Sequence, residues 1–355
     1  MIYSQSVLLI DLNALKENYL FLKQTAPNSI CAAVVKNNAY GLGIERVVPA
    51  LREVGCNDFF VALAVEGERV RSVAPQANIY VLQGIGDDSL KLFQDNKLIP
   101  VISTPAMFKF WMKNKIDGIK PVLNIETGLN RLGFRKKDVM ALTEDEKKEF
   151  SYLLSHLACA DEPYHFMNRH QIKEFEEMKK MLPNLKSTLS ASDGVFLGEN
   201  FQKDMVRLGA AMYGLNTAPD RQNKMKAVVH LKAPVLQIVN VSDGEYIGYG
   251  ASYKTKKEMK IAIVSIGYAD GLPRSLMGRG RVFFLDQEIR LIGRLSMDNL
   301  MCDVTDVKGL KEGMFVDVLN NHYTADDMGA DAGTIGYEIL NGVCKSGRVQ
   351  IIEKK

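Results

Sequence analysis

Eight short apolar runs between residues 30 and 215, each followed by a segment of helical periodicity, constrain the fold of this chain most. The runs are ICAAVVK (30–36), FFVALAV (59–65), IYVLQG (79–84), LIPVIS (98–103), KPVLNIET (120–127), SYLLSHLA (151–158), STLSAS (187–192) and DMVRLG (204–209). The segments between them are amphipathic, as in FMNRHQIKEFEEMKKML (166–182). Alternating strands and helices predict a (β/α)8 barrel over residues 11–230. An open doubly wound sheet is the alternative, because periodicity alone does not show closure.

The pattern changes after about residue 230, where helical spacing mostly disappears. Segments such as KAPVLQIVNV, MKIAIVSIGY, RVFFLDQEIRLIGRLSMD and MFVDVLNN alternate with Gly and Asp turns, which is typical of strands. A helix is predicted at TIGYEILNGV, followed by a last strand at RVQIIEK. Residues 231–355 therefore predict a second, mainly β domain.

Charge and cysteine content exclude several classes of function. The chain has 45 basic and 42 acidic residues, a balance that gives no reason to expect nucleic acid or an anionic membrane as a partner. The five cysteines form no C-x-x-C pair, so we predict buried free thiols and a reducing, cytoplasmic compartment. The first residues make a poor signal peptide, and no segment reaches the roughly 20 apolar residues of a membrane span. We predict no metal site.

Barrel enzymes carry their chemistry at the carboxyl ends of the strands, and polar residues stand at these positions here. They are Lys36 after the first run, Arg131 after the fifth, His156 in the sixth, Ser192 at the end of the seventh and Arg207 in the eighth. The loops after strands seven and eight often bind phosphate in this fold. The Ser192 hydroxyl and the backbone of Gly209 and Ala210 suit an anion there.

A lysine at the mouth of a barrel is suited to bonding a carbonyl group. Partial desolvation and neighbouring cations lower the pKa of an amine, and the neutral amine forms a Schiff base. With a phosphate site nearby, the carbonyl suggested is that of pyridoxal phosphate. Taken singly, Lys36 also fits a solvated surface lysine and His156 a hydrogen-bonded core histidine. Arg207 resists such an explanation, because a buried guanidinium needs a partner.

Six motifs, in order along essentially the whole chain, resemble those of the alanine racemase family: AVVKNNAYGLG, ETGLNRLGF, RLGAAMYGL, SIGYADGLPR, GRLSMD and TIGYEIL. The resemblance implies a barrel followed by a β domain, with a first strand at about residues 3–10 joining the β domain. It also implies a head-to-tail homodimer in which each active site combines the barrel of one subunit with the β domain of the other. The usual family role is D-alanine supply for peptidoglycan in bacteria; a catabolic role stays open.

The resemblance also implies roles for individual residues. Lys36 would hold pyridoxal phosphate covalently, and Arg207 would face the pyridine nitrogen. The phosphate would be bound by Tyr40, Ser192, Gly209, Ala210 and Tyr337. Arg131 would bind near the phenolic oxygen of the cofactor and the substrate carboxylate. Met297 and Tyr337 would keep the pocket small, with Asp298 beside them and Asn124 supporting Arg131.

Racemisation needs a proton removed on one face of Cα and returned on the other, which two bases on opposite faces accomplish. By the resemblance, Lys36 serves the D enantiomer and Tyr268 of the partner subunit serves the L enantiomer. The pKa of an unperturbed tyrosine is near about 10, which is too high for a good base at neutral pH. A link to His156, itself near Arg207, would lower this pKa.

Four positions depart from the common family pattern: Asn124 for a carbamylated lysine, Leu42 for histidine, Ala191 for asparagine and Ser296 for cysteine. None of these changes removes a reacting group. Asn124 supplies no charge, but its amide can accept a hydrogen bond from Arg131. The rival functions are a serine or broad-specificity racemase and a non-catalytic pyridoxal phosphate-binding protein. Arg207 argues against a related decarboxylase, which would carry an acid at that position.

Overall fold

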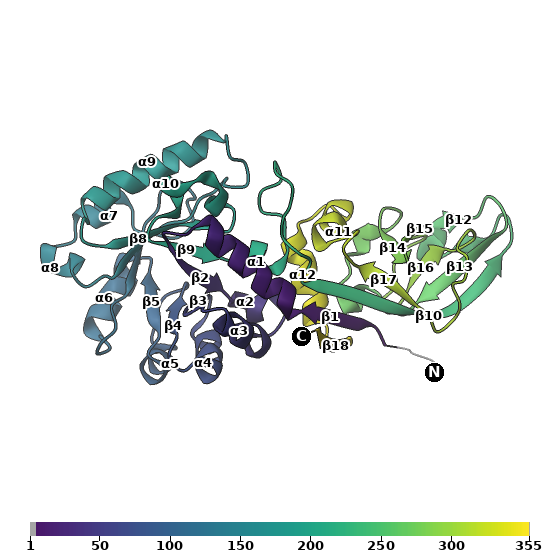
Figure 1. Cartoon of the computed structure of the whole chain (residues 1–355), viewed down its shortest axis with the longest axis horizontal. Helices are drawn as coiled ribbons and strands as arrows, with labels where there is room; N and C mark the ends of the chain where they lie inside the picture. Colours follow the sequence, from purple (N-terminus) through teal and green to yellow (C-terminus); the bar gives the residue numbers. More distant parts are fainter. Residues whose placement is uncertain (1–4, 355) are drawn as a thin grey trace.

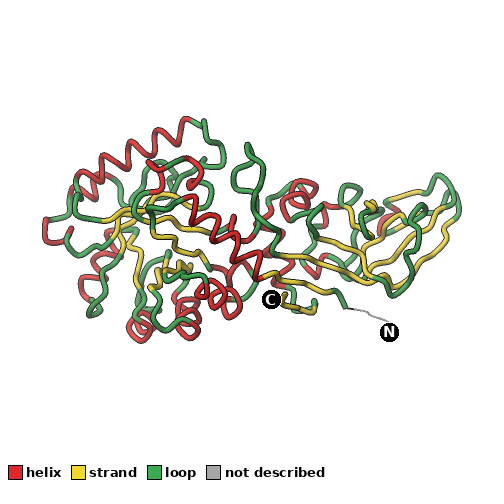
Figure 2. The backbone as a smooth tube through the Cα atoms, viewed as in Figure 1, coloured by secondary structure: helices red, strands yellow, loops and turns green. Residues whose placement is uncertain are grey.

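The computed structural model describes residues 5–354, and within them the eight apolar runs form a closed parallel barrel. Figures 1 and 2 show the barrel strands surrounded by helices at one end of an elongated molecule. The predicted closure is confirmed, and the open sheet is wrong. The barrel strands are β2 (Ile30–Val34), β3 (Asp58–Val61), β4 (Asn78–Val81), β5 (Ile99–Ile102), β6 (Val122–Asn124), β7 (Tyr152–Leu154), β8 (Lys186–Ala191) and β9 (Met205–Leu208).

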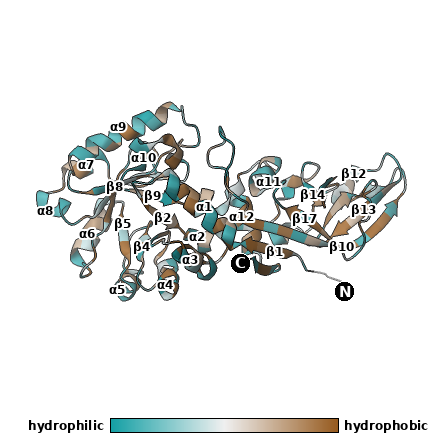
Figure 3. Cartoon of the chain, in the orientation of Figure 1, coloured by the Kyte–Doolittle hydropathy of each residue, from teal (hydrophilic) through white to brown (hydrophobic). Residues whose placement is uncertain are grey.

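Two apolar layers hold the barrel together. A small inner cluster, including the stacked rings of Phe60 and Tyr80, fills the barrel itself, and a larger cluster lies between strands and helices. The segment predicted as a helix at 166–182 is α9, whose Phe175 and Met178 are buried. Figure 3 shows the outer helices as largely hydrophilic. The barrel helices are α1 (Leu12–Thr25), α2 (Lys36–Tyr40), α3 (Ile44–Glu53), α4 (Ala64–Val73), α5 (Leu90–Asn96), α6 (Pro105–Lys113), α7 (Lys136–Met140), α8 (Glu144–Lys147), α9 (Phe166–Lys180), η1 (Gly194–Leu197), α10 (Glu199–Gln202) and η2 (Ala210–Tyr213).

The second domain is mainly β, as predicted, and is organised around one long strand, β10. β10 pairs with β1, β13 and β17, while β1 also pairs in parallel with β18. The N-terminal strand therefore joins the β domain as expected, although residues 3–4 of that expectation lie outside the described residues. The strands are β1 (Val7–Asp11), β10 (Val229–Val241), β11 (Tyr246–Ile247), β12 (Tyr253–Lys254), β13 (Met259–Val264), β14 (Arg281–Phe284), β15 (Gln287–Arg290), β16 (Leu300–Asp303), β17 (Phe315–Leu319) and β18 (Gln350–Lys354).

Helical segments of the second domain connect it to the barrel. The predicted helix near the C-terminus is α12 (Gly336–Lys345), preceded by α11 (Ala325–Ala332), and the short turns η3 (Tyr249–Ala251), η4 (Tyr268–Asp270) and η5 (Arg274–Leu276) complete the domain. A Cβ added at Gly41 would lie 2.7 Å from Cys344 Cβ, so α12 packs directly on the loop after β2. This contact carries Tyr337 to the mouth of the barrel.

The state of the cysteines and the lengths of the helices agree with the predictions made from the sequence. All five cysteines are free thiols, and four of them are buried, as predicted. Across residues 5–354, no helix combines the length and the apolar character needed to cross a membrane.

Candidate active site

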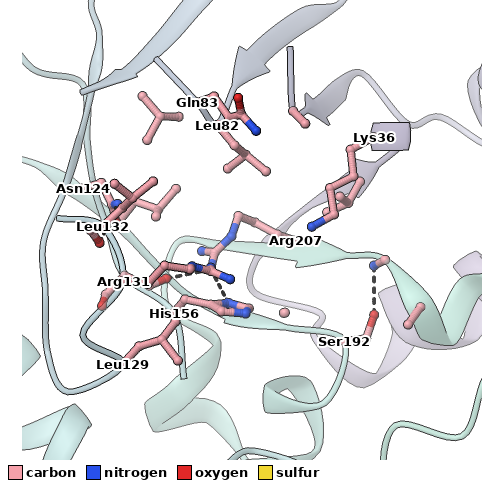
Figure 4. Close-up of a pocket in the computed structure, with 18 of the residues that line it drawn as sticks. Lys36, Leu82, Gln83, Asn124, Leu129, Arg131, Leu132, His156, Ser192 and Arg207 are labelled. Atoms are coloured by element: carbon pink, nitrogen blue, oxygen red, sulfur yellow. Dashed lines mark hydrogen bonds between the residues drawn. The ribbon is translucent and has the colours of Figure 1, made fainter. Parts of the chain in front are cut away.

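One cavity of about 380 Å³ opens at the carboxyl ends of the barrel strands. In Figure 4 the side chains of Lys36, Arg131 and Arg207 converge on it from the start of α2, from the loop after β6 and from β9. Ten of the residues predicted from the sequence line this cavity, namely Lys36, Tyr40, Asn124, Arg131, His156, Ser192, Arg207, Gly209, Ala210 and Tyr337. Residues from the ends of five barrel strands and from α12 thus meet in one place, as the end of a closed parallel barrel allows.

Lys36 stands at the start of a left-handed turn. The four residues after it, Asn37 to Tyr40, have φ angles of 54–56°. Such angles cost roughly 1–2 kcal/mol for each L-residue, so neighbouring groups must hold the turn in place. Glu66 Oε1 accepts the Asn38 N–H at 3.1 Å, and Arg69 Nη2 donates to Asn38 Oδ1 at 2.6 Å. The turn points the Tyr40 ring back toward the cavity.

The electrostatic surroundings of Lys36 favour its neutral form. Burial lowers the pKa of the amine, and the positive charges of Arg131 and Arg207 lower it further, while Glu66 opposes them. A neutral amine is both the nucleophile that attacks a carbonyl and a base that accepts a proton. The environment therefore prepares Lys36 for covalent and proton-transfer chemistry.

Arg207 is a buried guanidinium held in a fixed orientation at the base of the cavity. Its Nη1 donates to Thr188 Oγ1 at 2.7 Å, and its Nη2 donates to the carbonyl oxygens of Ser155 and Leu189 at 2.6 and 3.1 Å. Burial lowers its pKa to about 10, which leaves it protonated at neutral pH. The carbonyl and hydroxyl partners explain how a full charge is accommodated in an apolar strand.

His156 lies two residues beyond the end of β7 rather than inside the strand, because β7 ends at Leu154. This position turns its ring into the cavity, where Arg207 Nη2 lies 3.4 Å from its Nδ1. Since a guanidinium only donates, Nδ1 must accept, and the ring proton is then on Nε2. Burial and the charges of Arg207 and Arg131 lower the pKa of His156 to about 3. The ring is therefore a neutral donor through Nε2.

Hydroxyls and backbone N–H groups gather at the opposite end of the cavity. Ser192 Oγ accepts the N–H groups of Gly209 and Ala211 at 2.8 and 3.3 Å, so its own O–H remains available to an anion. A Cβ added at Gly209 would lie 2.8 Å from the Tyr40 hydroxyl, so a side chain there would displace that oxygen. The Tyr40 and Tyr337 rings lie 6.3 Å apart. This donor set suits a phosphate group.

Arg131 is presented by a loop that Glu126 and Asn124 fold. The Glu126 carboxylate accepts the backbone N–H groups of Gly128 and Arg131 at 2.5 and 3.0 Å. Asn124 Nδ2 donates to Leu132 O and Ser103 Oγ, both at 3.1 Å. These bonds of Asn124 reach the residue next to Arg131 rather than its guanidinium. Direct acceptance of a hydrogen bond from Arg131 stays a prediction.

Three predicted residues lie elsewhere: among the described residues that line the cavity, Tyr268, Met297 and Asp298 are missing. They form a second cluster on the β domain, where the N–H groups of Tyr268 and Ala269 donate to the carbonyls of Ser296 and Met297 at 3.1 and 3.0 Å. Arg348 Nη2 donates to Asp298 Oδ1 at 2.6 Å. Tyr268 and Met297 are 39% and 52% exposed, so both side chains are accessible on the surface of the β domain.

The departures from the family pattern occupy different surroundings. Leu42 is fully buried, Ala191 lines the cavity, and the Ser296 hydroxyl donates to Asn299 O within its own turn at 2.9 Å. The sequence reasoning missed further polar residues of the site, namely Glu66, Thr188, Asp193 and Glu126. Asp193 lies two residues after the end of β8, and Glu126 lies two residues after the end of β6. Polar residues at the carboxyl ends of barrel strands are candidates for the active site, so these positions would have identified both residues.

Comparison with known proteins decides the family. Models of the alanine racemase N-terminal and C-terminal domains match residues 10–217 and 228–352. The chain belongs to the alanine racemase family. This confirms the family that the six motifs predicted, and the family function is pyridoxal phosphate-dependent racemisation of alanine.

Individual alanine racemases are similar over nearly the full length. A biosynthetic alanine racemase of Agrobacterium fabrum is 38% identical over 95% of this chain and 91% of its own. A catabolic alanine racemase of Mesorhizobium japonicum is 39% identical over 94% of this chain and 90% of its own. The crystal structure of alanine racemase from Bartonella henselae with covalently bound pyridoxal phosphate has a TM-score of 0.94 at 32% identity, covering 99% of this chain and all of that chain.

Proposed function

We propose that this chain interconverts L-alanine and D-alanine with pyridoxal phosphate and two bases, Lys36 and Tyr268 of the partner subunit. The observation that carries the proposal is the single cavity that holds an amine of lowered pKa, a buried guanidinium and a phosphate-type donor set. Membership of the alanine racemase family supports the same reaction.

The cavity residues fit pyridoxal phosphate in both chemistry and arrangement. Ser192, Tyr40, Tyr337 and the backbone of Gly209 and Ala210 would hold the phosphate, because they offer hydroxyl and N–H donors together. Lys36 would hold the cofactor covalently through its amine. When bound, the pyridine ring supplies an electron sink that makes the Cα proton of an amino acid removable. The similar alanine racemase from Bartonella henselae holds this cofactor covalently.

Arg207 and Arg131 would orient the reacting groups. Arg207 keeps its proton, so it would donate a hydrogen bond to the pyridine nitrogen without protonating it. A ring that stays unprotonated withdraws electrons less strongly, which limits side reactions at Cα. Arg131, on the loop folded by Glu126, would bind the substrate carboxylate.

The second base would come from a partner subunit in a homodimer. Tyr268 and Met297 are exposed on the β domain. Leu132, which lines the cavity, is also exposed, as are Leu63 and Ile335, which lie within two residues of cavity-lining positions in the sequence. Pairing of two such surfaces under a twofold axis would bring Tyr268 and Met297 into the partner's cavity. If the chain divides into a barrel at 11–230 and a β domain at 231–355 that includes the first strand, the cavity mouth belongs to the barrel and the Tyr268 surface to the β domain. The free cysteines support a cytoplasmic setting.

His156 would activate the partner's Tyr268. The Nε2–H of its neutral ring would donate to the tyrosine oxygen and stabilise the phenolate, while Arg207 fixes the tautomer through Nδ1. The phenolate would then accept the Cα proton of L-alanine on one face. Lys36 would return a proton on the other face, and the roles reverse for D-alanine.

Replacing His156 with phenylalanine is expected to move the acid limb of the L-to-D pH profile to higher pH by about one to two units. A hydrogen bond to a charged group contributes roughly 1.5–3 kcal/mol, and its loss makes the phenolate harder to form. His156→Gln should shift the limb less, because an amide both accepts from Arg207 and donates. The measurement is kcat/KM for L-alanine against pH. Identical limbs in wild type and His156→Phe would contradict this role.

Polarimetric assay of purified protein is the direct test of the proposed function. L-alanine and D-alanine should each be converted into an equal mixture, with L-serine assayed alongside as the alternative substrate. Borohydride should attach the cofactor irreversibly to Lys36, identified by peptide mapping. A colourless protein without adduct or racemisation would refute the proposal.

A further inference from the structure

A carboxyl group stands at the phosphate end of the cavity, and none of the roles above uses it. Asp193 directly follows Ser192 and lines the same cavity as Tyr40, Gly209 and Tyr337. Its Oδ1 accepts the N–H of Gly194 at 2.9 Å, which caps the 3-10 helix η1. An ordinary cap does not need a negative charge, since serine and asparagine cap equally well.

The groups around Asp193 define its electrostatic setting. The pKa of its carboxyl is raised, chiefly by burial. The backbone N–H groups of Gly194 and of Asp193 itself oppose this effect, Asp161 in the loop after β7 adds to it, and Arg207 of β9 opposes it. Tyr40 of α2 and Tyr337 of α12 both interact with Asp193, which adds to the effect of burial in raising the pKa of each phenol. Asp193, both tyrosines and Arg207 thus line one cavity, and their charges influence one another there.

A carboxylate in this place conflicts with a phosphate. The hydroxyls of Tyr40 and Ser192 would donate to an anion, whereas an ionised Asp193 would repel it within the same cavity. A neutral carboxylic acid removes the repulsion and adds an O–H donor to the same set. The second ionisation of a phosphate monoester has a pKa near about 6, so the phosphate is largely a dianion at neutral pH.

We propose that Asp193 binds the cofactor phosphate as a neutral carboxylic acid, so that cofactor binding takes up a proton and weakens as the pH rises. This rests on the proposed function, because it concerns the same phosphate site. By linkage, a bound phosphate favours the protonated acid as much as the protonated acid favours the phosphate. Asp193 thereby makes retention of the phosphate sensitive to pH.

The test compares pyridoxal phosphate with pyridoxal, which lacks the phosphate but offers the same aldehyde to Lys36. Full-length enzyme is dialysed against graded concentrations of each compound between about pH 6 and 8.5, and retained cofactor is measured by absorbance. The ratio of the two affinities isolates the phosphate contribution, because the reaction with Lys36 is common to both. In wild type this ratio should fall about tenfold with rising pH, as a shift of one pKa unit implies.

Asp193→Asn and Asp193→Ser retain the cap and remove the charge, so their ratios should change less than about threefold over the same range. Two variants guard against one that fails to fold. Asp138→Asn is the matched control, because Asp138 also caps a helix, through the Arg135 N–H, but lies outside the cavity lining. Its ratio should follow wild type. Parallel pH profiles in wild type and both Asp193 variants would overturn the inference.

Calorimetry of pyridoxal phosphate binding in buffers of different ionisation enthalpy gives an independent measure. Wild type should take up as much as about half a proton more per site than Asp193→Asn, as a pKa shift of one unit implies, and equal uptake would overturn the inference. Failure of the proposed function looks different, because wild type would then form no borohydride-stable adduct at Lys36 with either compound.

Discussion

Replacing Lys36 with alanine is expected to abolish racemisation in both directions, lowering kcat/KM for L-alanine and for D-alanine by about 10,000-fold or more. The loss is symmetric because Lys36 would both hold the cofactor covalently and exchange the proton on one face of Cα. Burial and the nearby Arg131 and Arg207 charges lower the pKa of this amine, so no surface lysine is an equivalent replacement. Both directions are measured by polarimetry.

Two further variants test whether the covalent and proton-transfer roles of Lys36 can be separated from its positive charge. Lys36→Arg preserves a positive charge but forms no covalent bond with an aldehyde, so it should be as inactive as Lys36→Ala. Lys109→Ala, on the exposed side of α6, should behave as wild type. In Lys36→Ala the hydroxyl and N–H donors of the phosphate end remain, so pyridoxal phosphate should still bind but wash out on dialysis. Activity within tenfold of wild type in Lys36→Ala would exclude it as a base.

The barrel was predictable because each of its strands and helices is specified by residues that lie close together in the sequence. A run such as ICAAVVK is apolar enough to be buried on both sides, and α9 follows a helical period with Phe175 and Met178 inward. Closure of the barrel was not predictable from these local patterns, because it depends on the pairing of β2 with β9, some 175 residues apart in the chain. Once closed, the barrel brings Lys36 and Arg207 together without further information.

Local details of the site escaped the sequence for a different reason. The left-handed turn at Asn37–Tyr40 is disfavoured for Ala39 and Tyr40, and exists only because Glu66, Arg69 and Asn341 bind its asparagines. These partners come from other elements, so no local pattern reveals the turn. Asp193 escaped notice because an acid beside a predicted phosphate site looks unfavourable until its burial is known.

Tyr268 and Met297 illustrate what a single chain cannot supply. Their motifs indicated a role at the active site, yet the structure places them in an exposed cluster on the β domain, outside the cavity lining. Backbone hydrogen bonds between residues 268–269 and 296–297 hold the two side chains together as one unit. A preformed unit of exposed, chemically useful side chains is explained if the partner subunit covers it.

Mixing two defective variants is therefore expected to restore activity. Lys36→Ala lacks one base and Tyr268→Phe the other, so each homodimer should be impaired in L-to-D conversion. If sites are shared, a hybrid dimer has one doubly defective site and one intact site. Random association of equal amounts, by co-expression, makes half of the dimers hybrids and about a quarter of all sites intact. L-to-D activity should rise from near zero to about a quarter of the wild-type value.

The reverse experiment provides the control, because it predicts a change of opposite sign. Wild type co-expressed with the double variant Lys36→Ala/Tyr268→Phe gives hybrids in which every site lacks one base. Activity should therefore fall from about half to about a quarter of the value for wild type alone, since only wild-type homodimers contribute. If each site were built within one chain, the first mixture would stay inactive and the second would stay at about half. Either result would exclude shared sites, while restoration in one mixture and loss in the other would assign Tyr268 to the partner's cavity.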